Sequence, residues 1–329
     1  MNTLPIPTTS DEIAANLQAY AYDSDQAFSE NTIKAIKADS KRFADWCSER
    51  GVPSLPADPD TLRAYVDWGA ERFKPATVKR HLASIAHLHR AARLQDPTKD
   101  NKVRLAVKRM NRIKGTRQKQ ARGLTMTDAA IIKVSVEGTI RDVRDVAMIL
   151  IARDLLARSS ELVAMNREDV HFDEDGSGTV LIRKSKTDQE GMGAQRWISP
   201  DAVKALKKWL IFSGIEKGAI FQSVTKWGEV KRGSRLSTTD VYRSIRRLGE
   251  LIGIGVSGHS CRVGMAQDLT ANGAELAAIM QAGRWKSPTM PARYSERLAA
   301  GRGAVADLYK RKGVGFREES KEEKPLPSA

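Results

Sequence analysis

Seven residues between positions 158 and 294 are of the types that could act together on a phosphodiester. They are Arg158, Glu161, Lys186, His259, Arg262, Trp285 and Tyr294. Two guanidinium groups can hold the nonbridging oxygens of a phosphodiester as their negative charge grows, and an imidazole and an indole N–H can add donors. A phenol is a poor nucleophile at neutral pH, but it becomes competent beside cations that favour the phenolate. The residue types therefore fit nucleophilic attack on phosphorus.

Other chemistries lack their sequence signatures. The chain contains none of the patterns G-x-x-x-x-G-K-[ST], G-x-G-x-x-G, G-x-S-x-G or H-E-x-x-H, and no paired C-x-x-C. Its five histidines and two cysteines show no metal-ligand spacing. We expect no cofactor and no metal.

Composition points to a nucleic-acid partner. The 329 residues include 55 Lys and Arg against 40 Asp and Glu, a net charge of +15. With 41% hydrophobic residues and 12 Pro, the chain has the make-up of a folded protein of about two domains. A surplus of cations on folded surfaces favours a polyanion. Two cysteines and no apolar leader or span predict reduced thiols, no membrane partner and a cytoplasmic location.

The elements that would position these residues begin with a helical N-terminal domain, predicted over residues 11–114 after a flexible start, 1–10. In one helix Phe43 and Cys47 share an apolar face opposite lysines, and another, from about 76 to 94, buries Val78, Leu82 and Ile85. The polar faces supply candidate DNA contacts: Lys34, Lys41, Arg80, Ser84 and His87. Ordinary solvated faces are the alternative reading.

Between Lys102 and Arg122 stand nine basic residues and no acidic one. The second half of this run, residues 115–124, lacks helical periodicity and predicts a basic linker that crosses a phosphate backbone. A hinge with no ligand is the alternative.

A second domain is predicted over residues 125–312, with a flexible tail over 313–329. It opens with a capping-box signal, Thr125 to Asp128, and helical patterning resumes. After Asp169 the segments VHF, TVLIRKSKT and QRWIS read as three short strands, and a later helix opens with S-T-T-D from Ser237. The fold class expected is mainly α: a helical N-terminal domain and a mostly helical α/β domain with one small antiparallel sheet.

The order and local context of the candidate residues resemble the tyrosine recombinase (phage integrase) family. The segments that carry the likeness are LLARSSEL, KSKT, SGHSCRVG, MQAGRW and PARY, together with DQAFSENT, ADWC, HL…LHR, KQA and LST. The likeness spans roughly residues 10 to 310. Each residue taken alone has an ordinary structural reading, as a helix surface pair, a solvated lysine, a helix cap or a core aromatic. One departure is Leu-Ala before Arg158, where many members have Thr-Gly.

The resemblance implies a site-specific DNA recombinase that forms a covalent 3′-phosphotyrosine through Tyr294 and exchanges strands through a Holliday junction. By analogy Lys186 protonates the leaving 5′-hydroxyl, and Glu161 orients His259 or a site arginine. The energy of the broken bond is kept in the phosphotyrosine ester, so no ATP is required.

The resemblance also implies how the chain meets DNA. Thr239, Tyr242 and Arg243 align with a helix that enters the major groove, and Lys226 precedes that helix. The two domains are expected to form a C-shaped clamp, and a terminal helix, 304–310, to reach a neighbouring subunit. The expected partner is double-stranded DNA with an inverted-repeat site, bound by a homotetramer that is a monomer or weak dimer when free.

Two alternatives share this scaffold. One is a topoisomerase-like enzyme that relaxes DNA with the same tyrosine chemistry but without a preferred site. The other is a catalytically silent DNA-binding regulator. Covalent trapping on DNA distinguishes an enzyme from a binder.

Overall fold

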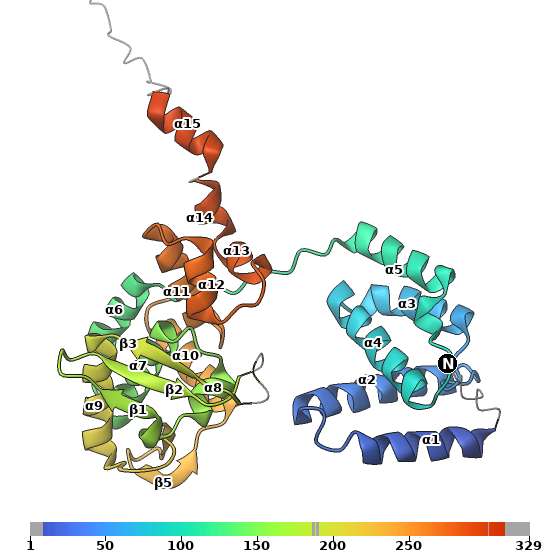
Figure 1. Ribbon diagram of the computed structural model, residues 1–329, viewed down its shortest axis with the longest axis horizontal. Helices are drawn as coiled ribbons and strands as arrows, with labels where there is room; N and C mark the ends of the chain where they lie inside the picture. The colour runs from blue at the N-terminus through green and yellow to red at the C-terminus, as the bar shows by residue number, and fades with distance from the viewer. Residues whose placement is uncertain (1–8, 186–187, 189–190, 302, 313–329) are drawn as a thin grey trace, which may run out of the picture. The chain divides into compact units, whose positions relative to one another are not determined.

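The computed structural model describes residues 9–185, 188, 191–301 and 303–312 (Figure 1). The chain forms two compact units, residues 1–119 and 120–329. Within the described residues, no helix is both long and apolar enough to cross a bilayer. The tail predicted over 313–329 lies outside the described residues.

Unit 1 (residues 1–119) is entirely helical in its described part. Its helices are α1 (Ser10–Asp23), α2 (Glu30–Ser48), α3 (Pro59–Arg72), α4 (Pro75–Ala91), the short 3₁₀ helix η1 (Pro97–Lys99) and α5 (Asn101–Lys114). Helix α2 packs on α4, and α3 packs on α5. The predicted helical N-terminal domain is therefore confirmed.

Capping residues explain where these helices begin. Asp58 accepts hydrogen bonds from two backbone N–H groups of α3, and Pro59 occupies its first turn. Thr9 caps α1 in a reciprocal capping box with Glu12, so the chain is already ordered at the end of the predicted flexible start.

The core of unit 1 is rich in aromatic rings. Phe43 and Trp46 of α2 pack against Tyr65 of α3 at centroid distances of 4.9 and 5.2 Å. Val78 and Ile85 of α4 close the same cluster. These large rings bury much apolar surface area, and their edge-to-face contacts determine how α2 and α3 pack against each other.

Unit 2 (residues 120–329) is mostly helical. Its helices are α6 (Met126–Ser135), α7 (Ile140–Asp154), α8 (Ser159–Ala164), the 3₁₀ helix η2 (Arg167–Asp169), α9 (Pro200–Ser213), α10 (Thr238–Leu251), α11 (Ser260–Ala271), α12 (Leu276–Gly283), α13 (Thr289–Tyr294), α14 (Glu296–Ala300) and α15 (Ala304–Lys312). Helix α7 lies at the centre, packed against α9 and α11.

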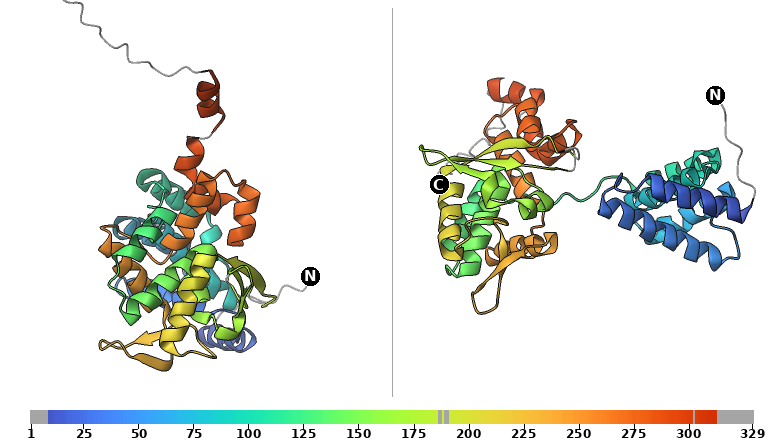
Figure 2. Two further views of the ribbon diagram at one scale, coloured as in Figure 1. Left: turned by 90° about the vertical axis from the view of Figure 1, so that its left-hand side faces the viewer. Right: turned by 60° about the horizontal axis from the view of Figure 1, so that its bottom comes forward.

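Two small antiparallel sheets complete unit 2. The first has the order β1 (Val170–Phe172), β2 (Gly178–Ile182) and β3 (Ala194–Ile198), as the sequence predicts. The second is a hairpin of β4 (Gln222–Val224) and β5 (Val230–Arg235), which the sequence analysis did not predict. Figure 2 shows this hairpin extending away from the rest of unit 2. The mainly α fold class with a small antiparallel sheet is confirmed.

Both cysteines are buried and free. Cys47 belongs to the core of unit 1 and Cys261 to that of unit 2, each 1% exposed. Burial raises the pKa of Cys47 to about 11 and that of Cys261 to about 12. Both thiols therefore stay protonated and act as small apolar side chains.

Candidate active site

A turn between α7 and α8 forms the first half of the site. Leu156 has a φ of 44°, and Arg158 then precedes the first turn of α8. Glu161 reaches back to Arg158: its Oε2 accepts from the backbone N–H at 3.0 Å and its Oε1 from Nη1 at 2.7 Å. Because Glu161 is only 3% exposed, its carboxylate holds the Arg158 guanidinium in a defined position. The Leu-Ala departure at 156–157 thus leaves a sharp turn in place without glycine.

Helix α11 contributes Arg262, which links this turn to a second segment. Its Nη1 donates to the carbonyl of Leu156 and its Nη2 to the carbonyl of Gly283, at the end of α12. The residue is 2% exposed. Burial, followed by the charge of Arg158, lowers the pKa of Arg262 to about 10. The group remains a cation at neutral pH.

Trp285 and Tyr294 lie next to this cation. The Arg262 guanidinium lies 4.1 Å from the centroid of the indole, and the rings of Trp285 and Tyr294 meet edge to face at 5.9 Å. The Tyr294 carbonyl accepts hydrogen bonds from Gln120 Nε2 at 3.0 Å and Gln267 Nε2 at 3.1 Å. These bonds fix the end of α13, and the half-buried phenol ring packs on the indole.

His259 stands at the edge of the cluster. It is exposed and immediately precedes α11, one turn before Arg262. A Cβ on Gly258 would lie 3.0 Å from Ser159 Oγ, so the turn bearing His259 lies against the residue that follows Arg158. Lys186 lies outside the described residues. The residues brought together are therefore Arg158, Glu161, Arg262, Trp285 and Tyr294, with His259 beside them.

Sequence reasoning missed Arg284. Its Nη2 donates to Glu161 Oε2 at 2.5 Å, and its side chain is 9% exposed. The available signal was its place directly before Trp285 in the segment MQAGRW. In so basic a chain an arginine is ordinarily an exposed residue, so nothing in the local pattern singled out Arg284.

The cluster is strongly cationic. The guanidinium groups of Arg158 and Arg284 bind the Glu161 carboxylate, and that of Arg262 lies close enough to interact with it electrostatically. Among the described residues no group of three or more His, Cys, Asp or Glu could hold a metal ion. The arrangement can therefore bind and stabilise an anion through preorganised N–H donors, with a phenol in contact.

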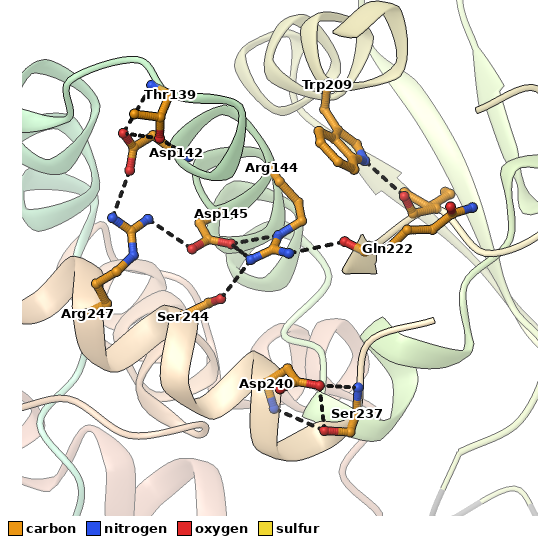
Figure 3. Close-up of polar contacts among 11 residues, drawn as sticks. Thr139, Asp142, Arg144, Asp145, Trp209, Gln222, Ser237, Asp240, Ser244 and Arg247 are labelled. Carbon is orange, nitrogen blue, oxygen red and sulfur yellow. Dashed lines mark hydrogen bonds and ion pairs between the residues drawn. The ribbon is translucent and has the colours of Figure 1, made fainter. Parts of the chain in front are cut away.

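Buried charges hold α10 against α7 (Figure 3). Asp145 on α7 is fully buried and accepts from Arg144 at 2.7 Å and from Arg247 of α10 at 2.9 Å. Arg247 also donates to Asp142 at 2.7 Å, and Arg144 donates to Ser244 of α10 at 3.3 Å. Arg144 donates a further bond, 3.1 Å long, to the first carbonyl of β4. The network joins α7, α10 and the β4–β5 hairpin.

This anchoring leaves one face of α10 open to solvent. A capping box between Ser237 and Asp240 starts the helix, and Thr239, Tyr242 and Arg243 are exposed just after it. Lys226, also exposed, lies in the turn of the β4–β5 hairpin with its Nζ 4.4 Å from the Trp227 ring.

In unit 1, three predicted contact residues are exposed cations paired with carboxylates. Lys34 pairs with Glu30 at 3.2 Å and Lys41 with Asp45 at 2.7 Å. Arg80 pairs with the buried Asp39 at 2.8 Å. The lysine pairs are exposed one-turn pairs of small energy, which a competing phosphate can replace.

The sequence predicted that Ser84 and His87 lie on an exposed face of α4. This prediction is wrong for Ser84, which is buried, and only partly correct for His87, which is half-buried. Ser84 is 4% exposed, because its hydroxyl donates to Asp39 at 3.2 Å beneath the Arg80 ion pair. His87 is half-buried between the rings of Tyr20 and Phe28, each 5.4 Å away. The cause is a buried aspartate on α2 and the cover of α1, neither of which the α4 pattern reveals.

Family models match both units. The model described as phage integrase family matches residues 117–300, and that described as phage integrase, N-terminal SAM-like domain matches residues 18–96. The first covers more than half of the chain and contains every residue of the site cluster.

The chain is similar to curated recombinases along nearly its whole length. It is 30% identical over 327 residues to recombinase cre of Escherichia phage P1, covering 93% of this chain and 95% of that one. It is 34% identical over 280 residues to an integrase/recombinase xerD homolog of Selenomonas ruminantium, covering 81% and 82%. Among solved structures, a lambda integrase tetramer bound to a Holliday junction matches with a TM-score of 0.57 at 20% identity, covering 86% of this chain and 76% of that one.

Proposed function

Because the chain belongs to the phage integrase family and is a tyrosine recombinase, we propose that it is a Cre-like site-specific recombinase of duplex DNA. Tyr294 forms a covalent 3′-phosphotyrosine intermediate, and neither a metal nor ATP takes part. The observation that carries this proposal is the convergence of the buried Arg262 guanidinium, the partly buried Arg158 guanidinium, an indole and the Tyr294 phenol in unit 2.

Cleavage proceeds by in-line attack. The Tyr294 oxygen bonds to phosphorus and loses its proton to water, while the bond from phosphorus to the 5′-oxygen breaks. Arg158 and Arg262 stabilise the extra negative charge on the nonbridging oxygens, and His259 and the Trp285 indole N–H add donors. Burial supports this role for Arg262, because a cation in a low-dielectric site interacts more strongly with developing charge.

The leaving group takes its proton from Lys186, which the resemblance assigns as general acid. A 5′-hydroxyl from a second strand then attacks the phosphotyrosine ester, and the phenol leaves. Bond energy is conserved through both steps, so strand exchange needs no external energy source.

Recognition of the site is divided among several surfaces. The open face of α10, with Thr239, Tyr242 and Arg243, reads base edges in the major groove, and Lys226 contacts the backbone. Lys34, Lys41 and Arg80 supply contacts from unit 1. Ser84 and His87 make no direct contact with DNA in this proposal. They support the interface indirectly, Ser84 by its hydrogen bond to Asp39 and His87 by packing against Tyr20 and Phe28.

Four protomers bring two sites together and resolve a Holliday junction. The matched lambda integrase structure, a tetramer bound to a Holliday junction, supports this assembly. Helix α15 supports it too, because its Val305, Leu308 and Tyr309 are at least half exposed and offer an apolar face to a neighbouring copy.

Covalent trapping tests the function. A pool of random duplexes is first selected for binding to the protein, and the selected sequence is then nicked at successive central positions to make suicide substrates. We expect an SDS-resistant protein–DNA complex with the wild type and none with Tyr294→Phe.

Tyr22→Phe is the matched control. It removes one phenol oxygen from a side chain of unit 1 that is 85% exposed and has no proposed part in cleavage, recognition or assembly, so it should leave trapping intact. Selective binding without any covalent complex would favour the silent regulator. Relaxation of supercoils with no sequence preference would favour the topoisomerase-like enzyme.

A further inference from the structure

Two guanidinium groups cross from one segment of the site to the other. Arg262 joins the Leu156 carbonyl to the Gly283 carbonyl. Arg284 spans the same gap, with Nη1 donating to the Leu155 carbonyl at 3.3 Å and Nη2 donating to Glu161. The first segment carries Arg158, and the second leads directly into Trp285 and Tyr294. Their relative position therefore depends on these two side chains.

The backbone at Arg284 is unusual for an arginine. Its φ is 56° and its ψ is 44°, the left-handed region in which glycine is favoured. The preceding Gly283 leaves no room for a side chain, because a Cβ there would lie 1.9 Å from the Trp285 ring. The turn is thus built tightly against the indole. A glycine at 284 would make it with less strain.

The guanidinium is also costly to bury. The Arg284 side chain is 9% exposed, and its Nε is buried without a hydrogen-bond partner among the described residues. Burial lowers the pKa of Arg284, and the charge of Glu161 opposes that shift. Neither the turn nor the packing requires a cation at this position. We therefore look for its function in the groups that it binds, the Leu155 carbonyl and the Glu161 carboxylate.

We propose that Arg284 is a positioning residue for DNA cleavage: by binding Glu161 Oε2 it locks the segment bearing Trp285 and Tyr294 to the turn bearing Arg158. That oxygen also accepts the Arg158 backbone N–H, so a single carboxylate atom sets both halves of the site. This inference rests on the proposed cleavage reaction.

The test is Arg284→Gly, which removes the guanidinium and suits the left-handed backbone. In single-turnover trapping on the suicide substrate we expect the rate to fall about 100-fold, as for a displacement of about 1 Å between reacting groups. The Kd for the duplex should stay within about threefold of wild type, because the Arg284 side chain is only 9% exposed and offers little surface for DNA contact. If this variant fails to fold, Arg284→Lys replaces it in the same measurements.

A double-mutant cycle with Glu161→Gln provides a readout that general destabilisation would not mimic. If Arg284 acts through Glu161, the double variant should be no slower than the slower single variant. Losses that multiply, or an Arg284→Gly rate equal to wild type, would overturn the proposal.

Arg93→Gly is the matched control. Arg93 has a φ of 59° and is exposed in unit 1, so glycine relieves the same backbone strain there without touching the site. Its cleavage rate should equal that of wild type. If the wild type itself gives no covalent complex, the proposed function fails, whereas an active Arg284→Gly refutes only the role of Arg284.

Discussion

At the scale of single residues, the hydrogen bonds of the buried His89 determine its protonation state. His89 in α4 is 1% exposed, and its Nε2 accepts from the Ala57 N–H at 3.0 Å. Its Nδ1 lies 2.8 Å from the Ile85 carbonyl, which can only accept, so Nδ1 carries the proton. The folded state therefore requires a neutral imidazole.

Acid should weaken unit 1 for this reason. Burial lowers the pKa of His89 and of His81 from the ordinary value of 6.5. Below pH 6.5 these histidines bind protons in the unfolded chain but stay neutral in the folded one. The free energy of unfolding therefore decreases as the pH is lowered from 6.5 to the lower pKa of the folded state. Urea unfolding should show a lower midpoint at about pH 5.5 than at about pH 7.5.

His89→Gln keeps an acceptor and a donor but does not titrate, so it should reduce this difference. His171, whose side chain is 77% exposed, serves as the control, and His171→Gln should leave the difference unchanged. Equal midpoints for the wild type at the two pH values would contradict the expectation.

At the scale of elements, the ionic network beneath α10 decides how that helix is held. Asp145 receives hydrogen bonds from two arginines and is wholly buried. Such a cluster adds little net stability compared with apolar packing, yet removing one member leaves cations uncompensated. Its effect is to specify one orientation of α10 and of the hairpin beside it.

Asp145→Asn should therefore lower the free energy of unfolding by about 3–5 kcal/mol. Asp45→Asn is the matched change at an exposed pair with Lys41 and should cost less than about 1 kcal/mol. Chemical denaturation of both variants gives the comparison. Equal losses would mean that the buried network is not what holds α10.

How far the elements could be predicted depended on local signals. The helices with caps and apolar periodicity, and the strands β1 to β3, follow from sequence patterns. The β4–β5 hairpin does not, because β5 is mostly exposed and basic and shows no apolar alternation. Ser84 was misjudged because its burial depends on Asp39 of another helix.

At the scale of the whole molecule, the net charge of +15 governs the encounter with DNA. Each cation that meets a phosphate displaces condensed counterions. Binding of the selected duplex should therefore weaken steeply with salt, with a slope of log K against log salt of about −6 or steeper. Gel-shift titrations over a range of salt concentrations measure it, and a shallow slope would count against an extended phosphate interface.

The site was predictable in its members but not in its geometry. Motif strings picked out Arg158, Glu161, Arg262, Trp285 and Tyr294, which the fold brings together from α8, α11 and the chain around α13. The sequence could not show that Arg262 is occupied by two backbone carbonyls, nor that Arg284 shares Glu161. The Arg262–Leu156 and Arg284–Glu161 contacts each join positions more than 100 residues apart, which no local pattern reveals.

The burial of both thiols has a practical consequence. Cys47 and Cys261 are inaccessible and protonated, so maleimide reagents should not react with them in the native protein. A cysteine engineered on the surface of each unit would then be the sole point of dye attachment in that unit. Fluorescence energy transfer between such dyes would report, in real time and without first replacing the native cysteines, any change in the distance between the two units when a duplex is added.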